Sequence, residues 1–155
     1  MESIRFISLD GRYAYIQKRQ GVLGLISSFR STDFISDQSN SDFIVSDSRF
    51  KRRLAIEIVP NYHNEFNILK NHKIVVVDWG KTQTIQIGAG RQPKLHLDDE
   101  WISYYEPTER RINIQNVITQ KKFQIKLSPK ASTYFFPEVE MISANTVIYT
   151  DVNDK

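Results

Sequence analysis

Cysteine is absent from this chain, and its absence excludes several classes of protein. Without thiols there is no disulfide framework, no cysteine nucleophile and no thiolate metal site. Glycine and proline are scarce, with 6 and 5 residues, which excludes a collagen-like or low-complexity chain. What remains is a chain of 155 residues, 40% hydrophobic and 12% aromatic, as in one globular domain with a real core.

Long hydrophobic runs are also missing. The longest apolar stretches, at 22–26 and 74–77, are much shorter than the roughly 20 residues of a membrane-spanning helix. The first ten residues include Glu2, Arg5 and Asp10 and hold no apolar run of signal-peptide length. We therefore expect no membrane span. The compartment stays open, because a leader could have been removed before residue 1.

Charge of one sign is not in large excess. Twenty-one Lys and Arg against eighteen Asp and Glu give a formal net charge of +3, spread along the chain. Basic clusters at 51–53, 110–111 and 121–122 fall at expected turns, where Lys and Arg ordinarily keep strand edges soluble. A nearby aromatic such as Phe50 could stack on a base. The small net charge nevertheless argues against nucleic acid as a partner.

The apolar residues alternate along the chain. At 82–88, 111–117 and 122–127 they recur at every second position, which is the period of a β-strand and not of a helix. The sequence therefore predicts an all-β chain of about twelve strands. His63–Lys70 is the only candidate for a helical turn, and Ser31–Asp42, rich in Ser, Asp and Asn, is the best loop candidate.

One pattern of strand, polar turn and strand recurs. It occurs at 6–16, 95–105 and 141–150, and with a longer basic turn at 43–58. Successive copies are offset by 41, 47 and 45 residues, counted from the first residue after each turn: Tyr13, Leu54, Trp101 and Thr146. A regular offset of this size is typical of a repeat protein.

A second hairpin follows the recurring pattern, as at 74–87 and 111–127. Each unit is therefore four strands in about 45 residues, the size of one propeller blade. The chain is expected to be a single all-β domain whose units span approximately 3–42, 43–92, 93–137 and, in part, 138–155.

These repeats resemble the blades of β-propellers, nearest to TolB-like and WD40-like repeats, over most of the chain. Leu9-Asp10-Gly11-Arg12 is similar to the Ser-Pro-Asp-Gly type turn of such blades, with looser copies at 97–100 and 142–145. Asp78–Lys81 resembles the turn between the third and fourth strands. The resemblance implies a β-propeller-like array of four-stranded antiparallel blades that forms an incomplete ring.

About three and a half blades are too few for a closed propeller, which has typically four to eight. Three explanations stay open. The chain is a piece of a longer propeller, it completes a ring with a protein partner or a second copy of itself, or it has a different closed fold. The leading different fold is a β-trefoil or other barrel, and a β-sandwich is the remaining alternative.

The histidines do not form a metal-binding pattern. His63, His72 and His96 would have to converge with a carboxylate to bind a metal, and their spacing matches no known ligand motif. We expect surface or strand-face histidines. Asp98-Asp99-Glu100 could hold a hard cation, but it lacks the spacing of a calcium loop, so a turn is predicted there. The sequence predicts no metal and no cofactor.

Motifs for catalysis are not found either. Gly88-Ala89-Gly90-Arg91 superficially resembles a phosphate cradle, but a strand and not a helix follows it. We expect it to connect two blades. No Gly-x-Ser-x-Gly elbow is present. The sequence thus predicts no catalytic or cofactor-binding residues and a protein that is not an enzyme.

Aromatic residues gather at or beside the second strand of each unit. Trp101 is expected in the core, and the neighbours Tyr104 and Tyr105 should point to opposite faces of one strand, each toward a different blade. The full set is Tyr13, Tyr15, Trp101, Tyr104, Tyr105, Tyr134, Phe135, Phe136 and Tyr149. At the ends of an incomplete ring, such residues would be anchors for a partner.

The predicted function is a non-enzymatic protein–protein interaction or scaffold module. Rigid propellers hold variable loops at fixed positions, and loops carry the contacts. Two alternatives remain: a fragment of a propeller-type hydrolase or lyase, and a β-trefoil module that binds carbohydrate.

Overall fold

The chain folds as β-strands throughout the part that the computed structural model describes, with fourteen strands and no helix. Side chains are described at 43–44, 52–59, 71–128 and 136–150; the remaining parts of β1–β6 are described by their backbone. The predicted all-β class is confirmed, with two strands more than expected. In these regions no helix could cross a membrane. The possible helical turn at His63–Lys70 lies outside the described residues.

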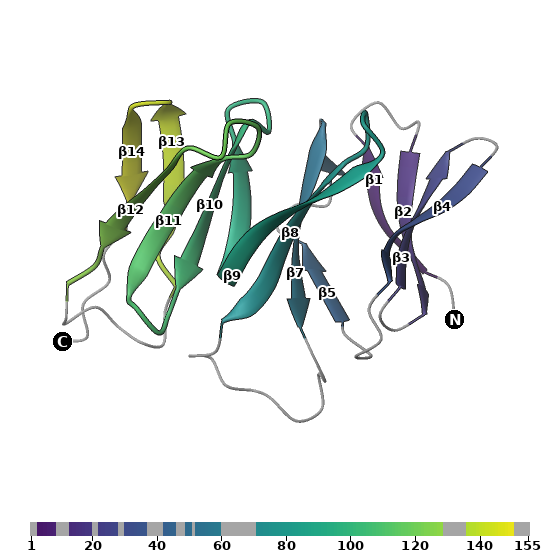
Figure 1. Ribbon diagram of the computed structural model, residues 1–155, viewed down its shortest axis with the longest axis horizontal. Helices are drawn as coiled ribbons and strands as arrows, with labels where there is room; N and C mark the ends of the chain where they lie inside the picture. The colour runs from purple at the N-terminus through teal and green to yellow at the C-terminus, as the bar shows by residue number, and fades with distance from the viewer. Residues whose placement is uncertain are drawn as a thin grey trace.

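Five strands form the sheet at the N-terminal end of the row of sheets in Figure 1, in the order β4-β3-β2-β1-β6. Their bounds are Ser3–Ser8 for β1, Tyr13–Arg19 for β2, Val22–Ser27 for β3, Arg30–Ser36 for β4 and Arg49–Phe50 for β6. The loop expected at Ser31–Asp42 is therefore wrong for residues 31–36, which belong to β4. Pairing with β3 outweighs the polar composition, and it places Leu23 opposite Ile35.

The second sheet has seven strands in the order β12-β11-β10-β9-β8-β7-β5. Their bounds are Asp42–Val45 for β5, Arg53–Val59 for β7, His72–Asp78 for β8, Gln83–His96 for β9, Trp101–Glu106 for β10, Arg111–Asn116 for β11 and Lys122–Lys126 for β12. Consecutive strands from β7 to β12 pair antiparallel. The hairpins predicted at 74–87 and 111–127 are confirmed.

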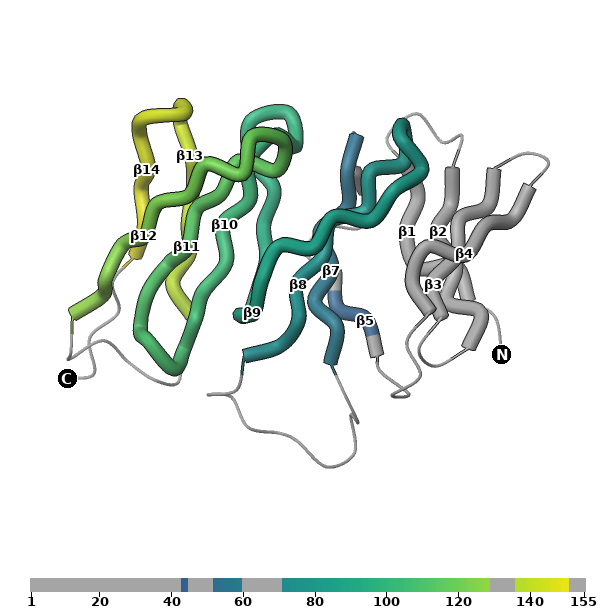
Figure 2. Tube along the Cα trace, in the orientation of Figure 1, coloured from purple at the N-terminus to yellow at the C-terminus, as the bar shows by residue number. Residues whose placement is uncertain are grey.

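Strand β9 bends and belongs to two half-sheets, as the trace in Figure 2 shows. Residues 83–90 pair with β8, and residues 91–96 pair with β10. We call β5, β7, β8 and residues 83–90 the first half-sheet, and residues 91–96 with β10–β12 the second half-sheet. At the bend Gln92 has a positive φ of 50°.

Gly88–Arg91 connects the two half-sheets, but it does so inside the continuous strand β9 and not as a separate loop. The glycines are needed for a close approach between the half-sheets. A Cβ on Gly88 would lie 2.9 Å from Tyr104 Oη, and one on Gly90 would lie 2.6 Å from the Tyr104 ring and from the Tyr105 carbonyl oxygen. Any side chain here would collide with β10.

The two half-sheets pack face to face around this bend. Ala55, Ile74 and Val76 of the first half-sheet form one buried cluster with Ile102 and Tyr104 of the second. All five side chains are at most 2% exposed. Burial of this kind between sheets is the main stabilising contribution to the fold.

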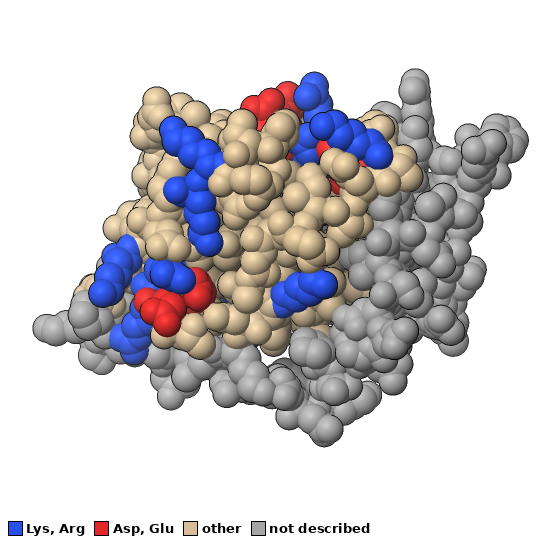
Figure 3. Space-filling view, viewed as in Figure 1, with Lys and Arg blue, Asp and Glu red and all other residues tan. Residues whose placement is uncertain are grey.

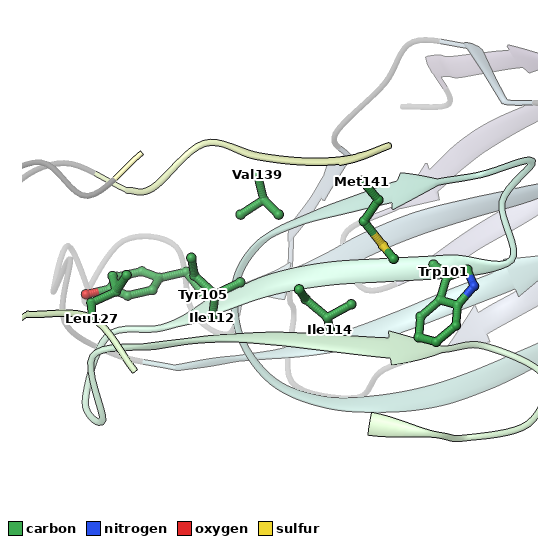
Figure 4. Close-up of a cluster of buried hydrophobic side chains, with 7 residues drawn as sticks. All are labelled: Trp101, Tyr105, Ile112, Ile114, Leu127, Val139 and Met141. Carbon is green, nitrogen blue, oxygen red and sulfur yellow. The ribbon is translucent and has the colours of Figure 1, made fainter. Parts of the chain in front are cut away.

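A hairpin of β13 (Val139–Ser143) and β14 (Thr146–Tyr149) covers the other face of the second half-sheet. Figure 4 shows Val139 and Met141 above Tyr105 and Trp101 in one cluster. Tyr104 and Tyr105 therefore face different clusters, and the predicted opposite orientation is confirmed. The core position predicted for Trp101 is confirmed as well, at 7% exposure.

The described strands form open sheets and close no barrel. The trefoil or other barrel that the sequence left as an alternative is therefore not supported by the pairing. The first half-sheet, the second half-sheet and the hairpin instead follow one another as layers, with β13 and β14 at the opposite end of the molecule from β1–β4 (Figure 1).

Candidate functional site

A cleft of about 610 Å³ lies where the two half-sheets meet the hairpin. Ile44 of β5, Gln92–Lys94 of β9, and Glu138–Glu140 at β13 line it, together with Ile148 of β14. Strand β5, the second half of β9 and strand β13 are each the first strand of one predicted repeat unit. The cleft is the candidate functional site because these three strands converge on it.

The base of the cleft holds a buried carboxylate, that of Glu57 on β7. Its side chain is 2% exposed, and its Oε1 lies 2.6 Å from His72 Nδ1 and 2.6 Å from Arg91 Nε. Its Oε2 accepts a hydrogen bond of 3.0 Å from the backbone N–H of Gln92. Both oxygens of Glu57 are therefore engaged, and together these bonds tie β7 to the bend of β9.

Sequence reasoning missed Glu57, although a signal was present. Glu57 is the single charged residue in the buried apolar run 54–59. A carboxylate at a core position of a strand needs a cationic partner or hydrogen-bond donors, since an unpaired buried charge is very costly. The partners His72 and Arg91 lie 15 and 34 residues further along the chain, where local pattern cannot reach.

A second polar group lies on the wall of the cleft, on the face that meets the hairpin. His96 Nε2 lies 2.8 Å from the hydroxyl of Ser103, and both side chains are buried. His96 Nδ1 lies 3.9 Å from Glu140 Oε1, and Lys94 Nζ lies 2.6 Å from Glu140 Oε2. Lys94 and Glu140 thus form the rim of the cleft above a buried Ser–His pair.

Burial determines the charge of His96. Loss of hydration and the nearby positive charge of Lys94 lower its pKa from 6.5 to about 4, against the opposing effect of Glu140. The hydrogen bond from Lys94, in turn, lowers the pKa of Glu140. At neutral pH the site therefore contains a neutral imidazole beside an ionised carboxylate.

Serine, histidine and carboxylate in this order are also the groups of an acyl-transfer triad. A nucleophile, however, must meet a substrate carbonyl, and Ser103 is only 2% exposed, in the middle of β10. Glu140 is engaged by Lys94 at the surface. We therefore interpret the hydroxyl of Ser103 as the hydrogen-bond partner that allows His96 to be buried.

A second ionic cluster ties the half-sheets together at the far end of β7. Arg53 Nε donates to Asp78 Oδ2 at 2.9 Å, and Arg53 Nη1 donates to the carbonyl oxygen of Asp99 at 2.9 Å. The Asp99 carboxylate accepts hydrogen bonds from the backbone N–H groups of Arg52 and Arg53. The turn predicted at Asp98-Asp99-Glu100 is confirmed, and Asp99 fastens it to β7.

Two expectations about charged side chains are corrected here. Arg53 is not a turn residue but a buried residue of β7, paired inside the protein. His72 and His96 lie on strands, as the strand-face alternative predicted, but they are buried, at 4% and 5% exposure, and not at the surface, because each has a hydrogen-bond partner. His63 and Lys51 lie outside the described residues.

The basic residues of the other two predicted clusters, at 110–111 and 121–122, are half-buried or exposed. Figure 3 shows Lys and Arg in several small groups on one face, two of them beside acidic side chains, and not in a continuous patch. Arg111, for example, pairs with Glu106 at 2.7 Å. Lys121 and Lys122 are exposed, and Lys122 Nζ lies 5.5 Å from the ring centre of Tyr104. Where side chains are described, no group of three or more metal-ligating residues occurs.

Comparison with protein-family models, curated proteins and solved structures finds no match to this chain. The function is therefore argued from the geometry of the cleft and the hairpin. Two polar residues that line the cleft are bound inside the protein, Glu57 to His72 and Arg91, and Ser103 to His96. The hairpin at its rim, by contrast, exposes Ile142, Ile148 and Tyr149 by 60%, 57% and 39%.

Proposed function

We propose that this chain is a non-enzymatic protein–protein interaction or scaffold module built from β-propeller blades, and part of a larger assembly. Face-to-face packing of successive sheets supports the proposal, since blades pack in this way around a propeller axis. Convergence of β5, β9 and β13 on one cleft supports it too, because the first strands of successive blades line the central channel.

The polar interior of the cleft favours a scaffold over an enzyme. Glu57 is bound by Arg91 and His72, and Ser103 is bound to His96. The bonds of Glu57 to Arg91 and to the backbone N–H of Gln92 join the first half-sheet to the bend of β9. The bonds to His72 and between His96 and Ser103 join neighbouring strands within a half-sheet. A rigid array of this kind presents its exposed elements at fixed positions, which is what an interaction module requires.

The single observation that carries the proposal is the exposed apolar surface of the β13–β14 hairpin. Ile142 and Ile148 are more than half exposed on a hairpin whose other side chains Val139 and Met141 are buried in the core. Exposed apolar side chains next to a packed core mark an interaction surface. In a propeller, the next sheet of the assembly would cover them.

The test compares partner binding by the full chain and two variants. We expect proteins retained by the wild-type chain from its source cells to be lost from Ile142→Asp and kept by Ile118→Asp, because Ile118 is similarly exposed, at 54%, but lies in the turn between β11 and β12. Retained proteins are identified by quantitative mass spectrometry and then re-bound in purified form. Equal retention by both variants, or none by the wild type, would contradict the proposal.

A further inference from the structure

Strand β14 has one open edge. It pairs with β13, and within the described part of the chain it has no second neighbour. The N–H of Thr150 donates to the carbonyl oxygen of Glu138, so residues 148 and 150 direct their backbone groups toward β13. By alternation, Val147 and Tyr149 direct their N–H and C=O groups toward the open edge.

This edge lacks the protection that another edge of the same protein has. β12 is the edge strand of the second half-sheet, and it carries the exposed residues Lys122, Gln124 and Lys126. Lysine on an edge strand prevents pairing with other strands. β14 reads Thr-Val-Ile-Tyr and has no charge, no proline and three residues of high strand propensity besides its threonine.

We propose that a second copy of this chain pairs with this edge, β14 to β14, antiparallel about a two-fold axis at Ile148. The inference rests on the proposed function and names a partner for the β14 edge of the same hairpin. The pairing produces a four-stranded sheet from two hairpins. A two-fold axis requires a self-complementary surface, and the residues of β14 meet this requirement.

The register about Ile148 brings together only favourable pairs. Val147 lies opposite Tyr149 of the partner subunit, and Thr146 lies opposite Thr150 of the partner subunit; pairs of aromatic with β-branched residues and pairs of threonines stabilise sheets. Val147 and Tyr149 exchange hydrogen bonds with the partner, so Ile148 is in a non-hydrogen-bonded pair with its own copy, at about 4.5 Å between Cα atoms. No two like charges are placed opposite each other.

The register is tested by a single cysteine, because the chain has none of its own. Cα atoms about 4.5 Å apart are within the range of a disulfide bond. We expect Ile148→Cys to form a disulfide-linked dimer under mild oxidation. The matched control Ile142→Cys, equally exposed but on β13, should stay largely unlinked. Non-reducing gel electrophoresis and intact mass measure both, and equal linkage of the two variants would overturn the register.

A charge exchange tests the two-fold axis itself. Light scattering should show a dimer for the wild-type chain and a monomer for Ile148→Lys and for Ile148→Glu, because each places like charges opposite each other. An equal mixture of the two variants should restore the dimer. A mixture that stays monomeric, or a wild type that is monomeric at about 100 µM, would overturn the proposal.

The outcome is distinguishable from that of the function test. Loss of the β14 pairing removes the dimer and leaves binding of other proteins through Ile142 intact. Loss of binding in Ile142→Asp, conversely, leaves the β14 edge and its dimer unchanged. A wild-type monomer that binds another protein would therefore refute self-pairing and keep the scaffold function.

Discussion

The charged residues in the interior each have a specific partner. Glu57 is held by His72 and Arg53 by Asp78, which lie 15 and 25 residues away in the sequence. The buried His96, which is neutral at neutral pH, is held by Ser103 on the neighbouring strand. Removing one partner would leave the other desolvated and unpaired, which costs more than the pair contributes. Arg53 and Glu57 therefore help to fix how one half-sheet lies on the next, and His96 holds β9 against β10.

The titration of His96 makes stability depend on pH. Its pKa is about 4 in the folded chain, against 6.5 for an ordinary histidine. Between these values the unfolded chain takes up a proton that the folded chain does not, so the stability is complete above pH 6.5 and decreases as the pH falls toward 4. We expect His96→Gln to lose less stability than wild type between pH ~7 and ~4.5.

Urea unfolding at several pH values measures this difference. Ser103→Ala is the control, because it removes the hydrogen bond to His96 without removing the titrating group. It should be less stable than wild type and still lose stability as the pH falls. If His96→Gln and wild type lose stability in parallel, the proposed role of His96 is wrong.

At the scale of the element, β9 decides the architecture. Its first half is the last strand of one half-sheet and its second half is the first strand of the next, with the bend between Gly90 and Gln92. The two glycines before the bend let Tyr104 lie against the backbone. A strand without them could not bring β10 onto β8, since any Cβ would hold the sheets apart.

Gly90→Ala should therefore destabilise the protein by about 1–3 kcal/mol, the typical cost of forcing extra atoms into a packed core. The matched control is Gly80→Ala, where the nearest atom to a new Cβ is Asp78 Oδ1 at 3.5 Å, an ordinary contact. This variant should stay within about 0.5 kcal/mol of wild type. The free energy of unfolding in urea measures both, and equal stability of the two variants would contradict the close approach.

At the scale of the whole molecule, the sheets are stacked, and each two neighbouring layers bury a hydrophobic cluster between them. β10 contributes Tyr104 to one cluster and Trp101 and Tyr105 to the next, so the second half-sheet lies between two apolar layers. Arg91 lies 5.2 Å from the ring centre of Phe136, and Lys94 binds Glu140, which adds polar contacts at the same junction. The hairpin is thus held both by the buried hydrophobic cluster and by polar contacts at the rim of the cleft.

Trp101→Ala tests the junction of the hairpin with the second half-sheet. The side chain is 7% exposed and its ring centre lies 5.4 Å from that of Phe123. We expect a loss of about 3–5 kcal/mol in urea unfolding, as for other large buried aromatics. The control Trp79→Ala, at a half-buried position after β8, should cost less. A near-zero change at Trp101 would show that it does not belong to the core.

Local pattern was sufficient to predict most of the strands and most of their turns. The period of two in 111–127 and the turn at 97–100 follow from side-chain alternation and turn chemistry, which act between near neighbours. The opposite orientation of Tyr104 and Tyr105 follows from the same geometry. These features needed no knowledge of the fold.

Tertiary structure decided the rest. A polar segment became β4 because β3 supplied hydrogen bonds, and Gly88–Arg91 became the middle of a strand because β10 packs on it. The burial of Glu57 and Arg53 depends on partners up to 46 residues away in the sequence. Alternation determines which residues share a face, but the burial of a charged side chain depends on the three-dimensional position of its partner.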